Sequence, residues 1–187
     1  MAQTAASAST ILPSSAALRL PVAMTMIRDA EEHDLPAILA ITNQAILHTT
    51  AIWSITPLDL PTREKWWRER TAAGFPVLVA EAEGEVIGFG SFGPFRPHEG
   101  YLHTVEHSVY VAPNAQRRGT GTALIHALIE RAVASGKHAM IGGIAADNAI
   151  SLALHRRLGF QETGRMPEVG RKFDRWLDLV LMQKLLS

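Results

Sequence analysis

Residues 116–121, Gln-Arg-Arg-Gly-Thr-Gly, place two arginines and two glycines where an apolar segment gives way to a predicted helix. The first backbone N–H groups of a helix have no partner inside it and carry partial positive charge, which favours binding of an anion. Gly119 and Gly121 leave room for close approach to the backbone, while Arg117 and Arg118 add full positive charges. The segment therefore predicts a phosphate-binding site, with an ordinary turn carrying basic residues as the alternative.

Several other kinds of site are excluded. No segment fits the G-x-x-x-x-G-K-[ST] pattern, and residues 119–124 lack the third glycine of a dinucleotide-binding fingerprint. The chain has no cysteine, which excludes disulfides, thiolate metal ligands and an acyl-cysteine intermediate. The histidines form no H-E-x-x-H motif, and His103 and His107, on one strand face, would lie about 13 Å apart. We expect no metal.

Composition indicates one globular domain. Of the 187 residues, 47% are hydrophobic and 19% charged, which suits a single domain with a sizeable core. The 18 basic and 18 acidic residues balance, so we expect no nucleic-acid partner and no attraction to an anionic membrane surface. No apolar run is long enough to span a membrane. Residues 1–23 are rich in Ala, Ser and Thr, which predicts a disordered extension before a single domain over residues 24–187.

The elements that must position the phosphate site alternate between strands and helices. Strands are predicted at residues 24–28, 77–82, 86–92, 103–111 and 138–145, with one or two more between 173 and 184. Helices are predicted to begin at 34, 61, 119 and 147 or 148, and the last three end near 74, 135 and 158.

The strand 103–111 has two different faces. Val105, Val109 and Val111 share one face, whereas the other face is polar. The polar face consists of Thr104, Glu106, Ser108 and Tyr110. We therefore expect this face to point at something other than the core.

A second motif follows the phosphate segment: Asn148-x-x-Ser151-x-x-x-His155-Arg156-Arg157-Leu158-Gly159-Phe160. Together with the Q/R-x-x-G-x-G/A pattern at 116–121, it resembles the signatures of the GNAT family of N-acetyltransferases, in the same order. Residues 104–111, preceded by Phe95-Arg96 and Tyr101, further resemble the phosphinothricin and methionine sulfone/sulfoximine acetyltransferases of that family. The resemblance covers roughly residues 26–185. It implies an α/β (α+β) fold whose central, mixed and mostly antiparallel sheet is splayed at the cofactor strand and flanked by helices on both faces.

The resemblance implies acetyl-CoA as the co-substrate, lying between two splayed strands. Its pantetheine arm would bind the backbone of Val109, Tyr110 and Val111 like an added strand. Its pyrophosphate would lie on the backbone N–H groups of Arg117, Arg118, Gly119, Thr120, Gly121 and Thr122. Asn148 and Ser151 would also contact the cofactor, although a simple helix cap is the alternative for Asn148.

Acetyl transfer to an amine requires removal of a proton and stabilisation of an oxyanion. Glu106 is the expected general base, because a half-buried carboxylate gains basicity, with a solvated surface glutamate as the alternative. The backbone N–H of Tyr110 or Val111 would hold the oxyanion. His155 stands where many relatives have tyrosine and is a candidate acid for the departing thiolate, with less weight than Glu106 because a lone helical histidine is more often structural.

Arg96 is the expected anchor for the acceptor, since a guanidinium grips a carboxylate through two parallel hydrogen bonds. The full set expected to bind the acceptor is Phe95, Arg96, Pro97, His98, Tyr101, Glu106, His107 and Ser108. Trp53, Phe95 and Tyr101 would wall a pocket or belong to the core. Residues 170–173 resemble a loop that relatives bring to the substrate cleft, and a dimer interface is one place from which such a loop would reach it. The resemblance implies a homodimer. We expect the protein in the cytoplasm, because acetyl-CoA is found there.

The function expected is transfer of the acetyl group of acetyl-CoA to the free amine of a small amino acid analogue. Phosphinothricin, methionine sulfoximine and methionine sulfone share an α-amine, a carboxylate and a tetrahedral polar head. Transfer would be direct, within a ternary complex. Two alternatives stay open: a non-catalytic module that senses acyl-CoA, and an acetyltransferase for a protein or peptide amine.

Overall fold

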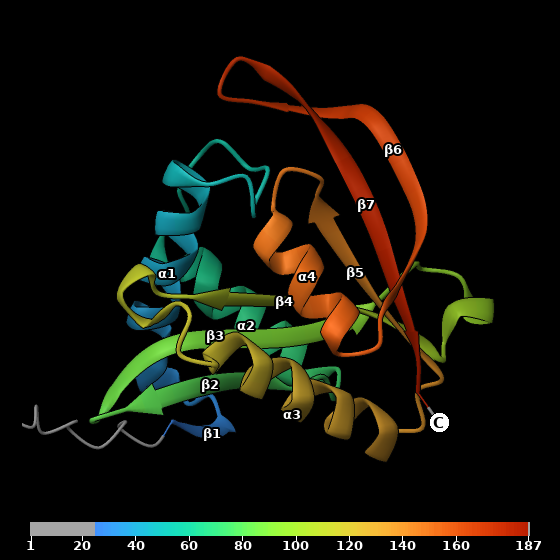
Figure 1. The fold of residues 1–187 in the computed structure, drawn as a ribbon. Helices are drawn as coiled ribbons and strands as arrows, with labels where there is room; N and C mark the ends of the chain where they lie inside the picture. Colours follow the sequence, from blue (N-terminus) through green and yellow to red (C-terminus); the bar gives the residue numbers. More distant parts are fainter. Residues whose placement is uncertain (1–24, 187) are drawn as a thin grey trace, which may run out of the picture.

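The computed structural model describes residues 25–186, and the expected extension over 1–23 lies outside the described residues, as does Met24 of the first predicted strand. The described chain folds around one seven-stranded sheet (Figure 1). The strands are β1 (Met26–Asp29), β2 (Val77–Ala82), β3 (Glu85–Pro94), β4 (Thr104–Val111), β5 (Ala139–Ala145), β6 (Gln161–Lys172) and β7 (Arg175–Leu185). The α-helices are α1 (Leu35–His48), α2 (Leu60–Ala72), α3 (Thr120–Ala134) and α4 (Ala149–Arg157). Short 3-10 turns are η1 (Glu32–Asp34), η2 (Glu99–Tyr101) and η3 (Pro113–Ala115).

The sheet is mixed and mostly antiparallel, as predicted. Its strand order is β1-β2-β3-β4-β5-β7-β6, and β4 and β5 form the parallel pair while the other neighbours are antiparallel. The parallel pair requires a crossover, which α3 supplies between β4 and β5. The glycine segment before α3 therefore lies at the end of β4.

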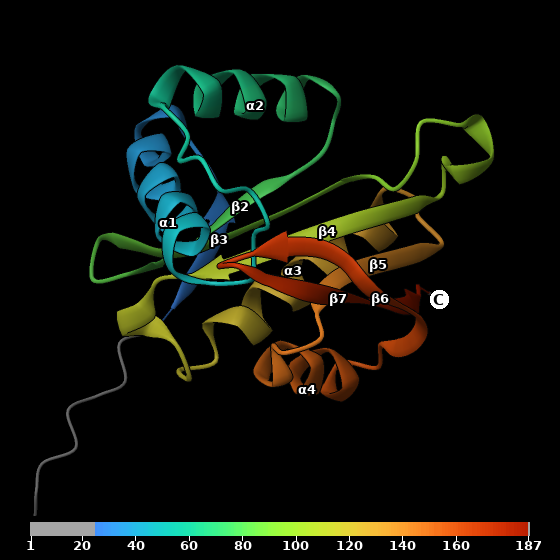
Figure 2. The same cartoon turned by 90° about the horizontal axis from the view of Figure 1, so that it is seen from above.

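Helices cover both faces of the sheet, which confirms the predicted layers. Figure 2 shows α1 and α2 on one side and α3 and α4 on the other. Successive residues of the buried strand β2 face opposite cores: Val79 packs with Ile38 of α1, and Leu78 packs with Leu124 of α3. This two-sided burial explains why residues 77–80 form a continuous apolar run.

The sheet opens between the two parallel strands. Pairing of β4 with β5 runs from Thr104 opposite Ala139 to His107 opposite Gly142 and goes no further. Residues 108–111 continue to pair with β3, and residues 143–145 with β7. The strands therefore diverge beyond His107, which confirms a sheet splayed at the expected cofactor strand.

The C-terminal hairpin differs from the expected arrangement. Strand β6 spans residues 161–172, where no strand was predicted, and the expected loop at 170–173 is the end of β6 and the start of a tight turn. Phe173 and Asp174, both with positive φ, form that turn. Nearly all of β6 is exposed, so its sequence lacks the alternation of apolar and polar residues that marks a half-buried strand. The hairpin rises beyond the rest of the sheet in Figure 1.

Candidate active site

A cleft lies where β4 and β5 diverge. Residues 108–110 and 142–145 form its two walls, and α4 closes one side with Asn148, Ser151 and His155. Beyond His107 the backbone groups of β4 that face β5 have no strand partner in the described sheet. Such an edge accepts an extended ligand that hydrogen-bonds like an added strand.

The start of α3 has the features of an anion-binding site. Gly119 is the N-cap residue with φ of 86°, and no side chain caps the helix. Arg117 also has a positive φ, of 62°, and the exposed Arg117 and Arg118 have no ion-pair partner within residues 25–186. A side chain at Gly121 would touch Leu154 of α4, which explains close packing of the two helices there. Free N–H groups, helix dipole and guanidinium groups together suit a diphosphate.

Glu106 lies half-buried on the polar face of β4, close to the cleft. Its Oε1 would be 3.2 Å from a Cβ on Gly143 of β5, so glycine at 143 leaves room for the carboxylate. Burial raises the pKa of Glu106 above its ordinary value of 4.5, and the positive charge of Arg96 opposes that rise. A partly desolvated carboxylate beside Gly143, a residue that lines the cleft, is suited to accept a proton.

Tyr110 shares the polar face but is directed away from solvent. Burial raises the pKa of its phenol, and the Arg63 guanidinium of α2 acts in the opposite direction. Arg63 is itself buried, stacks 4.5 Å above the Trp66 ring and donates to Thr42 Oγ1 at 3.0 Å. This buried cation could not be predicted from the sequence, because an arginine on an amphipathic helix ordinarily faces solvent.

His107 and His155 meet on the opposite side of β4 from Glu106. His107 was expected to bind the acceptor with the polar residues, yet it is buried on the valine face of β4, between Val105 and Val109. Its Nε2 lies 3.2 Å from Nε2 of His155 on α4. The structure thus brings His155 to the cleft wall, and it separates His107 from the polar residues expected to bind the acceptor.

The loop with Arg96 projects from the end of the sheet, on the right in Figure 2. Arg96 is exposed, donates to the Phe95 carbonyl at 3.1 Å and stacks 4.3 Å above the Phe95 ring. Phe95 and Tyr101 pack edge to face with ring centroids 5.7 Å apart, and Pro97 and His98 are exposed. The aromatic pair stiffens a loop whose guanidinium is near enough to influence Glu106.

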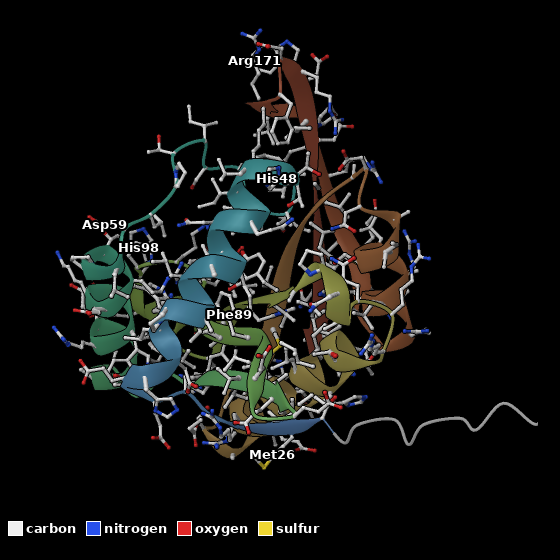
Figure 3. All side chains as sticks on the ribbon, turned by 90° about the vertical axis from the view of Figure 1, so that its left-hand side faces the viewer. Met26, His48, Asp59, Phe89, His98 and Arg171 are labelled. Atoms are coloured by element: carbon white, nitrogen blue, oxygen red, sulfur yellow. The ribbon has the colours of Figure 1, made fainter. Side chains whose placement is uncertain are left out.

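The β6–β7 hairpin holds the loop between α1 and α2 over the mouth of the cleft. Lys172 is buried and donates to the backbone carbonyls of Thr49 and Ile52, and the Trp53 ring lies over Gly170. Figure 3 labels His48 at the end of α1 below the hairpin tip that carries Arg171. Lys172 was expected only as a member of the 170–173 loop, with no role of its own, and the Gly142-Gly143 pair was not singled out from the sequence. A pair of glycines inside a strand is a usable signal, because it marks a close approach of another group.

Asn148 lies at the start of α4, beside the cleft. Its side chain accepts from the Ser151 N–H at 3.1 Å, which caps α4, and it also lines the cleft. The neighbouring Asp147 accepts from Thr50 at 2.9 Å and pairs with Arg175 of β7. The start of α4 is therefore tied to the covering loop and to the hairpin.

Two kinds of site find no support among residues 25–186. No helix in that range is both long and apolar enough to cross a membrane. No group of three or more His, Cys, Asp or Glu side chains in the same range is arranged to hold a metal ion.

The fold and the cleft define a class of protein that holds an extended, anion-bearing ligand between two diverging strands. Residues 35–160 match the model of the acetyltransferase (GNAT) family. The chain belongs to the GNAT family and is an acetyltransferase, so the sensor alternative is not supported.

Relatives and solved structures agree with that assignment. The chain is 55% identical over 158 residues to the L-methionine sulfoximine/L-methionine sulfone acetyltransferase of Pseudomonas aeruginosa, covering 84% of this chain and 92% of the relative. It is 36% identical to the phosphinothricin N-acetyltransferase of Alcaligenes faecalis, with 86% and 82% covered. A ribosomal-protein-alanine N-acetyltransferase structure from Brucella melitensis has a TM-score of 0.85 and 55% identity, with 86% and 99% covered. A putative acetyltransferase from Salmonella typhimurium, solved with its cofactor acetyl-CoA, has a TM-score of 0.85 and 48% identity, with 87% and 94% covered.

Proposed function

We propose that this acetyltransferase moves the acetyl group of acetyl-CoA to the α-amine of a small amino acid with a tetrahedral polar head. Methionine sulfoximine, methionine sulfone and phosphinothricin are the acceptors proposed. The observation that carries the proposal is the cleft between β4 and β5, with a carboxylate at its edge, in a chain 55% identical to a methionine sulfoximine/sulfone acetyltransferase.

The cleft and the glycine segment divide the binding of acetyl-CoA between them. The backbone of Val109, Tyr110 and Val111 binds the pantetheine arm along the unpaired edge of β4. The N–H groups of residues 117–122 bind the pyrophosphate, and Arg117 and Arg118 add charge. Asn148 and Ser151 contact the arm from the side of α4.

Glu106 acts as the general base, directly or through water. The acceptor arrives as an ammonium, so its proton must leave before nitrogen attacks the thioester carbon. The N–C bond then forms, the C–S bond breaks, and the electron pair stays on sulfur. The backbone N–H of Tyr110 or Val111 stabilises the oxyanion of the tetrahedral intermediate, since the strand already fixes those donors. The chain has no cysteine that could form an acyl-cysteine intermediate, which supports the proposed direct transfer.

Arg96 binds the α-carboxylate of the acceptor. It is exposed, has no carboxylate partner within the described chain, and its charge reaches Glu106. The two groups together would hold the two charged ends of an amino acid, with the amine at Glu106 and the carboxylate at Arg96. Phe95, Pro97, His98, Tyr101 and Ser108 complete the acceptor surface.

We further propose a homodimer that works in the cytoplasm, where acetyl-CoA is found. The outer half of the β6–β7 hairpin exposes Met166, Val169, Phe173 and Trp176. Exposed apolar side chains gathered on one element are typical of an interface. A second copy of the chain would cover them.

A protein N-terminus is the second candidate acceptor, because the Brucella structure at 55% identity is described as a ribosomal-protein-alanine N-acetyltransferase. A thiol-release assay with acetyl-CoA separates the two. The panel contains the three proposed analogues, free amino acids, polyamines and short peptides with N-terminal alanine. We expect the highest kcat/KM for one of the analogues. A higher kcat/KM for the alanine peptides would replace the proposed acceptor, and no thiol release with any amine would overturn the proposal.

A further inference from the structure

Two histidines are stacked on the wall of the cleft, one from β4 and one from α4. Their ring centroids are 5.1 Å apart with an interplanar angle of 19°. Gly142 lies against both rings: a Cβ there would be 3.2 Å from His107 Nε2 and 3.3 Å from His155 Nε2. Phe160 packs against both rings from the residue before β6. Glycine on one side and phenylalanine on the other leave the pair little freedom to move.

The hydrogen bonds determine where the protons are. His155 Nδ1 lies 2.7 Å from the Ser151 backbone carbonyl, which can only accept, so Nδ1 carries a proton. In a neutral His155 the other nitrogen, Nε2, is then an acceptor. The nearest group to it is His107 Nε2, at 3.2 Å, which must donate.

Both rings are neutral at pH 7. Burial, together with the neighbouring His155, lowers the pKa of His107 to about 3. Burial also lowers the pKa of His155, although its bond to Ser151 acts in the other direction. The neighbours from the packed elements, Ser151, Gly142 and Phe160, are uncharged. His107 Nδ1 remains a buried acceptor without a partner in the described chain.

We propose that His107 is a positioning residue for His155: its Nε2–H donates to His155 Nε2 and holds that imidazole with both ring nitrogens engaged. The inference rests on the proposed function, because it assigns His155 a role beside the thioester. It also changes the role expected from the resemblance. A ring whose N–H is committed to Ser151 has no proton directed at the departing sulfur.

The consequence is that coenzyme A leaves as a thiolate. Glu106 keeps the proton taken from the ammonium, the C–S electron pair stays on sulfur, and no proton passes through the histidine pair. A thiol with a pKa of about 8.5, like that of cysteine, makes an acceptable leaving group in this form. His155 then contributes a rigid wall that orients the thioester.

The tautomers can be observed without turnover. Two-bond 1H–15N correlation spectra of the full chain, labelled at histidine, distinguish protonated from bare ring nitrogens, and single substitutions assign His107 and His155. At pH 7 we expect a protonated Nδ1 on His155 and a protonated Nε2 on His107. A His155 protonated on Nε2 would overturn the proposal, whatever the acetyltransferase activity of the chain.

Two substitutions at 107 form a matched pair. His107→Gln places an amide N–H near the position of Nε2, whereas His107→Leu removes the donor. We expect the Gln variant to keep the His155 tautomer and kcat within about threefold, and the Leu variant to mix tautomers and lower kcat about tenfold with little change in KM. Equal kcat in the two variants would refute positioning through the hydrogen bond.

His155→Phe covers the case in which the Leu variant does not fold, which thermal unfolding would show. A ring of similar shape keeps the wall, so we expect at least about one tenth of kcat to remain. A loss of about 100-fold or more, the size typical of a proton donor, would overturn the proposal. Absence of turnover in the unchanged chain would instead count against the proposed function and leave the tautomer measurement intact.

Discussion

At the residue scale, the surroundings of Glu106 set the pH range of the reaction. Burial raises its pKa above the ordinary 4.5, opposed by Arg96. A general base works only when deprotonated, so kcat/KM should fall as the pH falls through this pKa. We expect that acid limb at a higher pH than a solvated glutamate would give. The measurement is kcat/KM from pH 4 to pH 9.

Removing the carboxylate tests its chemical role. Glu106→Gln keeps the shape but accepts no proton, so we expect kcat to fall about 100-fold or more at neutral pH. The dissociation constant of acetyl-CoA, measured by calorimetry, should be nearly unchanged. Glu99→Gln, an exposed glutamate on η2, is the matched control and should behave like the unchanged chain. Equal turnover in both variants would remove Glu106 from the mechanism.

Arg96→Ala separates binding from basicity. Loss of the charge-assisted hydrogen bonds should raise the acceptor KM by a factor corresponding to about 1.5–3 kcal/mol. Because Arg96 lowers the pKa of Glu106, its removal should also move the acid limb to higher pH. Arg131→Ala is the control, an exposed arginine paired with Asp29. An unchanged KM would contradict carboxylate binding by Arg96.

Gly143 shows that an absent side chain also shapes the site. A Cβ at this position would lie 3.2 Å from Glu106 Oε1, so Gly143→Ala should displace the carboxylate and lower kcat about tenfold. At Gly164 of β6 a Cβ would meet Leu181 at 3.9 Å, an ordinary contact, so Gly164→Ala should leave kcat unchanged. Similar kcat values for the two variants, measured under saturating substrates, would argue against this constraint.

At the scale of elements, the sequence predicted what local signals specify and missed what distant contacts specify. The helix after Gly119 and the strand with Glu106 follow from glycine, proline and alternation patterns. Strand β6 could not be found in this way, because it is exposed and its partner is the more apolar β7. The pairing of His107 with His155 depends on a contact 48 positions apart in the chain. The position of His107 on the valine face could nevertheless have been predicted from the alternation of residues 103–111 alone.

The covering loop depends on one buried lysine of β6. Lys172 donates to the carbonyls of Thr49 and Ile52, and Lys172→Met would leave both without that donor. We expect the free energy of unfolding to fall by about 1–3 kcal/mol, measured by urea denaturation. The loosened loop should also raise the acceptor KM. Lys137→Met, at a lysine bound to the Leu102 carbonyl away from this loop, is the control. A Lys172→Met variant as stable as the unchanged chain would show that water replaces the lost donor.

At the scale of the whole molecule, the open sheet separates two tasks. Helices α3 and α4 lie on one face of the sheet and α1 and α2 on the other (Figure 2), and the loop between α1 and α2 reaches the start of α4, where Thr50 donates to Asp147. The hydrogen-bonded halves of β4 and β5, from Thr104 to His107 and from Ala139 to Gly142, hold the two strands together below the gap. In the proposed direct transfer, donor and acceptor would meet at the gap between these strands, each approaching from one face of the sheet.

The exposed apolar side chains of the β6–β7 hairpin predict that the molecule forms a dimer. Trp176 is 58% exposed and Val169 50%, and we expect the 20.4 kDa chain to elute as a dimer when its mass is measured by light scattering. Trp176→Glu should shift the mass toward the monomer, because a charge at the interface costs more than it does in water. Val133→Glu, at a 48% exposed position on α3, should leave the mass unchanged. Since Lys172 and Gly170 contact the covering loop of the same protomer, the monomeric variant should retain its affinity for acetyl-CoA. A monomeric mass for the unchanged chain at micromolar concentration would contradict the proposed dimer.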